Sequence, residues 1–182
     1  MTDKAQLRAD ARTRRKAAFV AVDITPATDG LLEALTGRQG PIAFYWPIRT
    51  EIDPRPAMEL CAAEGQVCLP VTHGYEPLTF RVWTPDTPLE RDDFGTSYPS
   101  QAVSVTPKTL VVPLLAFDRR GHRLGYGAGH YDRTLDGLRA DHAITAIGFA
   151  YGAQEIVRVP EEPTDQPLDL IVTELETISP GG

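Results

Sequence analysis

The sequence predicts an α/β fold, with one layered domain over residues 1–182 and a largely parallel central sheet flanked by helices. Two observations predict this fold. Segments with the composition of helices alternate along the chain with short apolar segments that are typical of strands. Residues 109–117 form a nearly unbroken apolar run, as expected for a strand that is buried on both faces of a parallel sheet. A chain of 182 residues is long enough to bury one such core.

The first element is a helix predicted over residues 4–19, which are rich in Ala, Arg and Lys and contain no Gly or Pro. Asp3 could cap the start of this helix. Helical spacing gathers four cations on one side, namely Lys4, Arg8, Arg12 and Arg15. Such a stripe is either a solvated face or a cationic cover for an anion site that is built elsewhere in the chain.

The remaining elements follow from local composition. A second helix begins at Thr25 and Pro26, because Pro suits the first helical position, and it ends at Gly37. Further helices are predicted over residues 56–64 and 132–139. Strands are predicted over residues 42–46, 67–70, 78–83, 109–117, 143–151 and 168–173. Residues 84–106 are rich in Pro, Asp, Ser and Thr, so they are expected to be mostly loop, and a loop of this length in a compact domain is often functional.

Composition limits the classes of function. The net charge of −7 disfavours nucleic-acid binding. Because the chain has neither an apolar segment long enough to span a membrane nor the apolar core of a secretory signal, we expect a cytoplasmic protein without a membrane partner. Cys61 and Cys68 match no zinc or redox spacing, and the histidines form no metal pattern. We expect a monomer that binds small molecules.

The most distinctive stretch covers residues 119–133. Its glycines are Gly121, Gly125, Gly127 and Gly129, and its basic or imidazole side chains are Arg119, Arg120, Arg123, His130 and Arg133. Glycines permit positive φ and close approach to a ligand, and successive N–H groups of such a loop can bind an anion. A buried strand, a basic glycine-rich loop and a helix start together form a phosphate-binding layout. The G-x-G-x-G spacing is neither the dinucleotide fingerprint nor a Walker A loop. The alternative is a tight crossover with solvated arginines.

Polar and aromatic side chains also gather after the strand predicted at residues 42–46. Glu51 and Asp53 follow its carboxyl end, where open parallel sheets bind ligands, so they could hold a polar substrate. Tyr45 and Trp46 could stack on a flat ring. Equally, the two aromatic residues could belong only to the core, and Glu51 could be a surface acid.

Five segments of the chain, in order, are similar to one known family. They cover residues 4–8, 44–51, 112–121 and 123–133, and the fifth consists of residues 159–160, 164–168 and 171–173. The most specific segment reads Arg-Leu-Gly-Tyr-Gly-Ala-Gly-His-Tyr-Asp-Arg. On these motifs, which extend over nearly the whole chain, the protein resembles the 5-formyltetrahydrofolate cyclo-ligase family, also called 5,10-methenyltetrahydrofolate synthetases. That family often has Gly or Lys where Ala128 stands, and Phe or Tyr where His130 stands.

The resemblance implies a fold of the ribose-phosphate isomerase and CoA-transferase type. It implies a reaction in which ATP and 5-formyltetrahydrofolate give 5,10-methenyltetrahydrofolate, ADP and phosphate, with Mg²⁺. The γ-phosphoryl group of ATP would transfer to the formyl oxygen, and N10 of the folate would then close the ring as phosphate departs. Phosphoryl transfer needs positioning and charge neutralisation more than a covalent enzyme intermediate, which suits a basic glycine-rich loop.

Roles for individual residues come from the same resemblance. The implied ATP-binding residues are Lys4, Arg8, Arg123, Leu124, Gly125, Tyr126, Gly127, Ala128, Gly129, His130 and Tyr131. The implied substrate-binding residues are Trp46, Glu51, Tyr126 and Tyr131, the implied catalytic residues are Lys4 and Arg123, and the implied Mg²⁺ ligands are Asp132 and Asp165. Position alone would make Asp132 a helix cap and Asp165 a turn acid, so those two interpretations stay open.

Two other classes of function are compatible with the sequence. One is a folate- or nucleotide-binding protein that has no turnover. The other is a sugar-phosphate isomerase or CoA transferase on the same scaffold, which would need no ATP. Nucleic-acid binding through the basic helix at residues 4–19 is a third possibility, which the acidic net charge disfavours.

Overall fold

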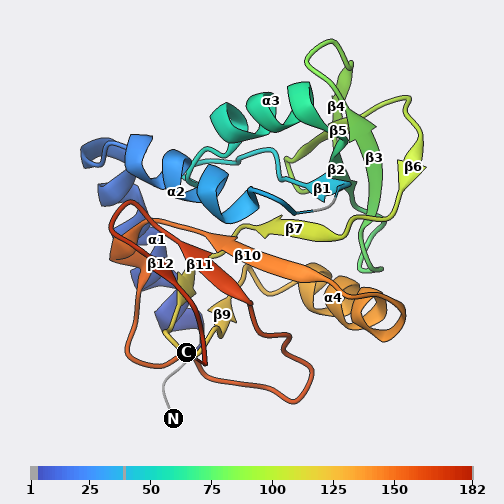
Figure 1. The fold of residues 1–182 in the computed structure, drawn as a ribbon. Coiled ribbons are helices and arrows are strands. Elements are labelled where there is room, and N and C mark those ends of the chain that lie inside the picture. Colours follow the sequence, from blue (N-terminus) through green and yellow to red (C-terminus); the bar gives the residue numbers. More distant parts are fainter. Residues whose placement is uncertain (1–3, 39, 182) are drawn as a thin grey trace.

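The computed structural model describes residues 4–38 and 40–181, so the predicted cap at Asp3 lies outside the described residues. Figure 1 shows one sheet with helices on both sides. The helices are α1 (Lys4–Ala21), α2 (Thr25–Leu35), α3 (Arg55–Glu64), α4 (His130–Asp141) and the 3₁₀ helix η1 (Gly152–Gln154). The strands of the sheet are β1 (Ile42–Ala43), β2 (Val67–Val71), β3 (Thr79–Trp83), β6 (Ser104–Val105), β7 (Thr109–Val112), β10 (Thr145–Phe149), β11 (Leu170–Val172) and β12 (Thr177–Ile178).

The sheet has eight strands in the order β12-β11-β10-β7-β1-β2-β3-β6. The pairs from β11 to β2 in this order are all parallel. The outer pairs are antiparallel: β12 pairs with β11, β3 with β2, and β6 with β3. The predicted α/β class with a largely parallel central sheet is therefore confirmed.

Different helices cover the two faces of the sheet (Figure 1). Leu31 of α2 and Met58 of α3 share one core cluster with Val111 of β7. Leu135 of α4 belongs to a second cluster together with Leu110 of β7. Neighbouring residues of a strand point to opposite faces, so β7 is apolar throughout because both of its faces are buried. No helix within the described residues is both long and apolar enough to cross a membrane.

The strand predicted over residues 109–117 is wrong in its second half. β7 ends at Val112, and the next residue, Pro113, has no backbone N–H with which to continue a central strand. The chain then leaves the sheet, and β8 (Ala116–Phe117) pairs with β9 (Arg123–Leu124) in a separate antiparallel hairpin. The glycine-rich loop therefore follows this hairpin, not a strand of the central sheet.

Other predicted boundaries also need correction. Residues 84–106 are mostly loop, as predicted, but they also contain the hairpin of β4 (Leu89–Arg91) and β5 (Ser97–Pro99) as well as β6, which were not predicted. The Asp92 carboxylate makes the turn of that hairpin by accepting the N–H groups of Phe94 and Thr96. The strand predicted at residues 42–46 shortens to β1, and β12 was not predicted. Strands of two or three residues are too short to show an apolar period in the sequence.

The helix predicted at residues 4–19 is confirmed and extends to Ala21 as α1. Its inner face packs on the β8–β9 hairpin, where Ala11 shares a small core cluster with Leu115 and Leu124. This packing places the basic start of the chain beside the glycine-rich loop, which is more than a hundred residues away in sequence.

Candidate active site

The residues predicted to form the site surround one cavity of about 970 Å³. Every residue that the sequence assigned to ATP, substrate or metal lines this cavity. The cavity also touches Trp46 after β1, Thr72 after β2 and Pro113 after β7, so it lies at the carboxyl ends of neighbouring parallel strands. That location is where ligands bind in open α/β sheets, and the volume is in the range of ligand pockets.

The glycine-rich loop presents free backbone donors beside this cavity. Gly127 has a φ of 107° and Gly129, which caps α4, has a φ of 69°. Within the described part of the chain, no backbone N–H group of residues 125–129 donates a hydrogen bond to the protein. Free N–H groups at a helix start favour an anion.

Two of the sequence-based expectations about this loop are refined by its conformation. Gly125 does not have the positive φ that was expected of the loop glycines. Ala128 does not have one either, so an alanine fits that position without backbone strain. The His130 ring contacts Phe94 edge-on at 5.1 Å between centroids and stacks on Tyr75 at 6.4 Å. His130 thus packs as an aromatic residue at the position where the family often has Phe or Tyr.

Cations from α1 reach the loop. The Arg8 guanidinium donates through Nε to the carbonyl of Gly125 at 3.0 Å. Lys4 pairs with Glu162 across the cavity, with 2.6 Å between Nζ and Oε1. This pair is largely exposed, so we expect it to contribute little to stability and to open readily for a phosphate.

Arg123 is the most enclosed cation of the loop segment, with a side chain that is 5% exposed. Its guanidinium donates to Asp132 Oδ1 at 2.6 Å and also to the backbone carbonyl of Gln166. Burial lowers the pKa of Arg123, which the carboxylates of Asp132 and Asp165 oppose, and an arginine remains charged at neutral pH. The cavity therefore contains a fixed positive charge in a poorly solvated wall.

Arg119 and Arg120, which the sequence counted with the basic loop, do not line the cavity. Arg119 pairs with Glu155 and Glu176 at the surface. Arg120 pairs with Asp118 and Glu161. Both arginines belong to the turn between β8 and β9, which directs them away from the glycine-rich loop. The cationic part of the site is therefore smaller than the sequence suggested.

The two predicted metal ligands lie in the same wall of the cavity. Asp132, in the first turn of α4, accepts the Arg123 guanidinium and the N–H of Gln166 through the same oxygen, Oδ1. Asp165, next to Gln166, accepts the N–H of Glu162 through Oδ2, so it also makes the turn that the sequence offered as an alternative. The cap of α4 is Gly129 and not Asp132.

Within the described residues, no group of three or more His, Cys, Asp or Glu side chains is arranged to hold a metal. Two carboxylates that line the cavity beside its cations nevertheless fit Mg²⁺, which usually takes one or two carboxylates together with substrate phosphates and water.

Glu51 also lines the cavity and is buried, with 5% exposure. Its carboxylate accepts the Ile48 N–H at 2.9 Å and the Tyr126 hydroxyl at 2.7 Å. Burial raises the pKa of Glu51, although these hydrogen bonds and the charge of Arg15 oppose the shift. The sequence left open whether Glu51 is a surface acid, and the structure excludes that interpretation.

The predicted aromatic residues surround this acid. Trp46 lines the cavity, and the Arg55 guanidinium lies over its ring with 5.2 Å between Arg55 Cζ and the ring centroid. Tyr131 also lines the cavity, and burial raises the pKa of its hydroxyl, with the Glu51 carboxylate adding to the shift. Tyr45 lines the cavity too and donates its hydroxyl to the Ile52 carbonyl at 2.6 Å. Asp53, the other acid suggested from the sequence, pairs with Arg55 instead.

Sequence reasoning missed the role of Arg15 and of the segment at residues 160–166. Arg15 was assigned only to the basic stripe of α1, yet its side chain is 2% exposed and lies 3.8 Å from Glu51. Residues 160 and 162–166 line the cavity, although only Asp165 was predicted. Helical periodicity places Arg15 on the same face as Lys4 and Arg8, and that spacing was the available signal.

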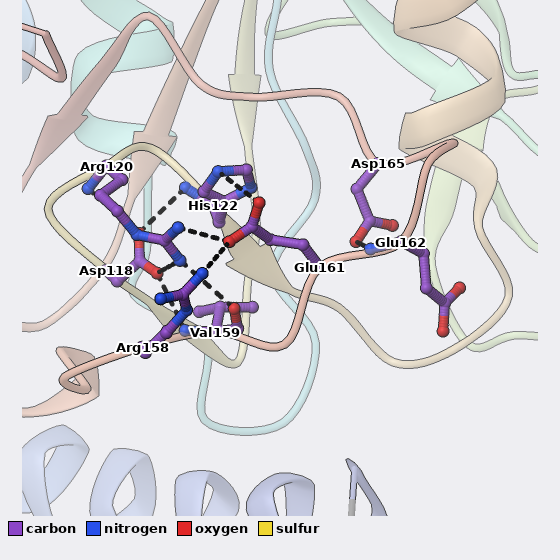
Figure 2. Close-up of polar contacts among 8 residues, drawn as sticks. All are labelled: Asp118, Arg120, His122, Arg158, Val159, Glu161, Glu162 and Asp165. Atoms are coloured by element: carbon purple, nitrogen blue, oxygen red, sulfur yellow. Dashed lines mark hydrogen bonds and ion pairs between the residues drawn. The ribbon is translucent and has the colours of Figure 1, made fainter. Parts of the chain in front are cut away.

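A charged cluster behind the cavity holds this segment in place. Figure 2 shows Arg120, His122 and Arg158 converging on Glu161. The buried Asp118 accepts the N–H of Val159 at 2.9 Å and the guanidinium of Arg120 at 2.7 Å. Asp118 thus joins the β8–β9 hairpin, which bears Arg123, to the segment that bears Asp165.

Asp118→Asn is expected to destabilise the protein by about 3 kcal/mol, because it removes a buried, fully hydrogen-bonded charge. The melting temperature would then fall by roughly 6–12 °C in a chain of this size. Burial acts to raise the pKa of Asp118, but hydrogen bonds from Val159, Arg120 and His122 outweigh it and the pKa is lowered. Wild type therefore has this stabilisation above the unfolded pKa of about 3.9 and loses it as pH falls through the folded pKa.

Thermal melts from pH 3 to pH 8 check this expectation, with the exposed Asp29→Asn of α2 as control. The difference between wild type and Asp118→Asn should shrink toward the acid end of the range. A constant difference, or one no larger than that of the control, contradicts the linking role of Asp118.

Gly127→Ala is expected to destabilise the ligand-free protein by about 2 kcal/mol, because a side chain rarely adopts a φ of 107°. An added Cβ would meet the Arg8 guanidinium only at ordinary contact distance, 3.5 Å, so the cost lies in the backbone. Gly125→Ala is the matched control, since its φ is not positive and its Cβ would meet nothing within 4 Å. Urea denaturation of both variants distinguishes them, and equal losses of stability would contradict the loop conformation.

Known proteins are similar to this chain over most of its length. Residues 1–174 match the model of the 5-formyltetrahydrofolate cyclo-ligase family. The 5-formyltetrahydrofolate cyclo-ligase of Haemophilus influenzae is 36% identical over 140 residues, which are 72% of this chain and 74% of that protein. The enzyme of the same name from Escherichia coli is 34% identical over 140 residues, which are 72% of this chain and 76% of that protein.

Two solved structures have the same fold. The 5,10-methenyltetrahydrofolate synthetase of Aquifex aeolicus superimposes with a TM-score of 0.78 and 26% identity, over 98% of this chain and 93% of that one. The synthetase of Mycoplasma pneumoniae has a TM-score of 0.71 and 21% identity over 95% of this chain and 99% of that one, which supports the fold alone.

Proposed function

The chain belongs to the 5-formyltetrahydrofolate cyclo-ligase family, and we propose how the residues of its cavity carry out the ATP-dependent conversion of 5-formyltetrahydrofolate to 5,10-methenyltetrahydrofolate. The observation that carries the assignment of roles is a single cavity lined by two chemically different groups of residues, which we assign to two ends. One end has free N–H groups and the cations Lys4, Arg8 and Arg123. The other has the buried carboxylate of Glu51 among aromatic rings.

At the cationic end, the N–H groups of residues 125–129 hold the polyphosphate, and Arg8 and Lys4 balance its charge. Arg123 faces the γ-phosphoryl group, where negative charge must be stabilised during transfer. Asp132 and Asp165 would hold Mg²⁺, which supplies further positive charge to the phosphates when it is bound. Lys4 exchanges its partner Glu162 for a phosphate oxygen.

At the acidic end, Glu51 accepts hydrogen bonds from N–H groups of the pterin, and Trp46 and Tyr131 pack against its ring. A charged acceptor in a buried site discriminates strongly in favour of a ligand with matching donors. This placement directs the formyl group of the folate toward the phosphates.

The chemistry then proceeds in two steps. The formyl oxygen attacks the γ-phosphorus, so that an O–P bond forms and the bond to the ADP oxygen breaks. N10 attacks the activated formyl carbon, its proton leaves, and the C–O bond breaks with release of phosphate. The enzyme needs to position and neutralise charge in both steps, and no residue has to form a covalent bond.

Incubation of the purified protein with 5-formyltetrahydrofolate and Mg²⁺, with and without ATP, tests the assignment. Methenyl product, seen by its near-ultraviolet absorbance, and ADP should appear in equal amounts and only with ATP. Binding of both ligands without ADP release would instead favour a silent binding protein. Turnover that needs no ATP would favour an isomerase or transferase. Addition of a chelator should abolish the reaction, and unchanged turnover would remove the roles of Asp132 and Asp165.

We further propose that the enzyme works as a monomer of one domain in the cytoplasm, on small molecules and without a nucleic-acid or membrane partner. Support comes from a cavity that residues of one chain line, from a sheet that joins strands from both halves of the chain, and from the net charge of −7. Size-exclusion chromatography with light scattering tests the monomer.

A further inference from the structure

The Tyr126 side chain connects the glycine-rich loop to Glu51. Its backbone belongs to the glycine-rich loop, between Gly125 and Gly127, and its hydroxyl donates to Glu51 Oε1 at 2.7 Å. The preceding carbonyl, of Gly125, is the acceptor for Arg8. A single residue therefore joins the loop that faces the phosphates to the acid that faces the pterin.

Arg15 completes the connection from a third segment. Its side chain is 2% exposed, and its Nη1 donates to the Tyr126 hydroxyl and lies 3.8 Å from Glu51 Oε1. Its Nε donates to Thr50 Oγ1 at 3.1 Å, and its guanidinium lies over the Tyr126 ring at 5.5 Å. The Tyr126 hydroxyl thus both accepts from a buried cation and donates to a buried anion, so its position is strongly defined when the loop is ordered.

The loop itself has more freedom than the hydroxyl. Glycines on both sides of Tyr126 allow many backbone conformations, and the free N–H groups of residues 125–129 have no protein partner within the described structure. A ligand that occupies those N–H groups restricts the loop, which costs conformational entropy. Because the first ligand has already ordered the loop, the second ligand binds without that cost.

We propose that Tyr126, held by Arg15, couples the binding of ATP to the binding of the folate. Nucleotide on the loop fixes the backbone of Tyr126, and the phenol then holds Glu51 in the orientation that accepts the pterin. Coupling free energies are reciprocal, so the folate tightens nucleotide binding by the same factor. The inference depends on the proposed function and adds a positioning residue to it.

The surroundings of Glu51 provide a second signature. The charged and titratable groups that face it are Arg15 from α1, Arg49 from its own loop, Tyr45 from the segment after β1, and Tyr126 and Tyr131 from the glycine-rich segment. Of these, Tyr126 and Arg15 help to lower the pKa of a carboxyl that burial raises. Folate affinity is expected to fall at low pH as Glu51 takes up a proton. Loss of the Tyr126 hydroxyl should move this fall in affinity to higher pH, and no such move is expected if Tyr126 is only structural.

Tyr126→Phe tests the coupling because it removes one oxygen and keeps the ring. Calorimetric titration gives the Kd of 5-formyltetrahydrofolate with and without a saturating ATP analogue that cannot be cleaved, and the Kd of the analogue with and without the folate. In wild type we expect each ligand to tighten the other about tenfold. In Tyr126→Phe the factor should fall below about twofold in both directions. Tyr98→Phe, whose hydroxyl contacts Glu90 outside the cavity, is the matched control and should keep the wild-type factor.

Arg15→Lys is a second variant, which keeps a positive charge near Glu51 and loses the hydrogen bonds of the guanidinium fork; we expect a partial loss of coupling. If Tyr126→Phe weakens both ligands but leaves the coupling factor unchanged, Tyr126 is only structural and the inference is overturned. If wild type turns over its substrates but each ligand binds equally well with and without the other, the inference is also overturned, whereas the proposed function stands. Failure of wild type to bind either ligand removes the proposed function together with the inference.

Discussion

Arg123→Ala is expected to lower kcat/KM for ATP roughly a thousandfold, the size of effect seen when a preorganised charge stabiliser is removed from a phosphoryl-transfer or oxyanion site. The reason is burial. The Arg123 side chain is 5% exposed, so its charge acts through a poorly screened environment and water cannot replace it. Its loss also leaves Asp132 without its cation at the place where we propose that the phosphates bind.

Folate binding should change much less, by at most about threefold, because Arg123 makes no hydrogen bond or ion pair with Glu51 in the described structure. Only an indirect effect, of the size of a weak coupling between the two ligands, is expected. Steady-state kinetics at saturating folate, combined with direct titration of the folate, separate the two effects. Titration also shows that the variant is folded, which matters since removing one partner of a buried pair is destabilising.

Two comparisons make the Arg123 experiment specific. Arg119→Ala removes an arginine from the same hairpin that pairs with Glu155 and Glu176 at the surface, and its kinetics should stay near wild type. Lys4→Ala should raise the KM for ATP by roughly tenfold only, because a partly exposed, already paired ammonium contributes less than a buried cation. If Arg123→Ala and Lys4→Ala both keep the wild-type KM and turnover with ATP, the phosphate site is elsewhere.

The parts of the fold and site that the sequence predicted are those with a local signal. The apolar run at β7 and the glycine-rich motif each occupy a few consecutive residues, so composition and spacing show them directly. Arg8 is different, because it meets Gly125 across 117 positions of sequence. Only the resemblance to a family placed these two together, since periodicity describes an element and not its neighbours.

The failures also have physical causes. Pro113 ends β7 in the middle of an apolar run, and the run continues because the hairpin that follows is buried too. Arg119, Arg120 and Arg123 are similar in sequence context. Arg119 nevertheless pairs with surface acids and Arg120 with the buried Asp118 and with Glu161, while Arg123 enters the cavity. Which arginine is buried is decided by the turn of the β8–β9 hairpin and by its distant partners, and those are set only in the folded chain.

Glu51→Gln is expected to raise the KM for 5-formyltetrahydrofolate roughly a hundredfold, with a change in the KM for ATP of at most about threefold. Gln keeps the shape of Glu, but its amide has one acceptor oxygen where the carboxylate has two. In wild type the two carboxylate oxygens of Glu51 accept the Ile48 N–H and the Tyr126 hydroxyl. The pterin donors would lose a charged acceptor in a buried site. Hydrogen bonds to charged groups contribute about 1.5–3 kcal/mol each, and a loss of about 3 kcal/mol corresponds to a hundredfold in affinity.

The pH dependence supplies an independent check of the same prediction. Burial raises the pKa of Glu51 above its ordinary value, so the ionised acceptor is lost on acidification at a higher pH than for an exposed carboxyl. Wild-type folate affinity should therefore fall on the acid side, and Glu51→Gln should lack that limb. Glu33→Gln, an exposed residue of α2, should retain it.

The contribution of Glu51 to the stability of the fold should depend on pH in the opposite sense to its contribution to folate affinity. A carboxyl whose pKa is raised in the folded state makes the fold less stable as pH rises from its unfolded pKa through its folded pKa, because the folded state then holds the proton more tightly than the unfolded chain. Glu51→Gln has no carboxyl at this position, so this loss of stability is absent. We therefore expect the change in melting temperature from about pH 4 to neutral pH to be more favourable in Glu51→Gln than in wild type. If Glu51→Gln instead weakened ATP selectively while folate affinity and the pH profile stayed at the wild-type level, Glu51 would belong to the nucleotide end of the cavity.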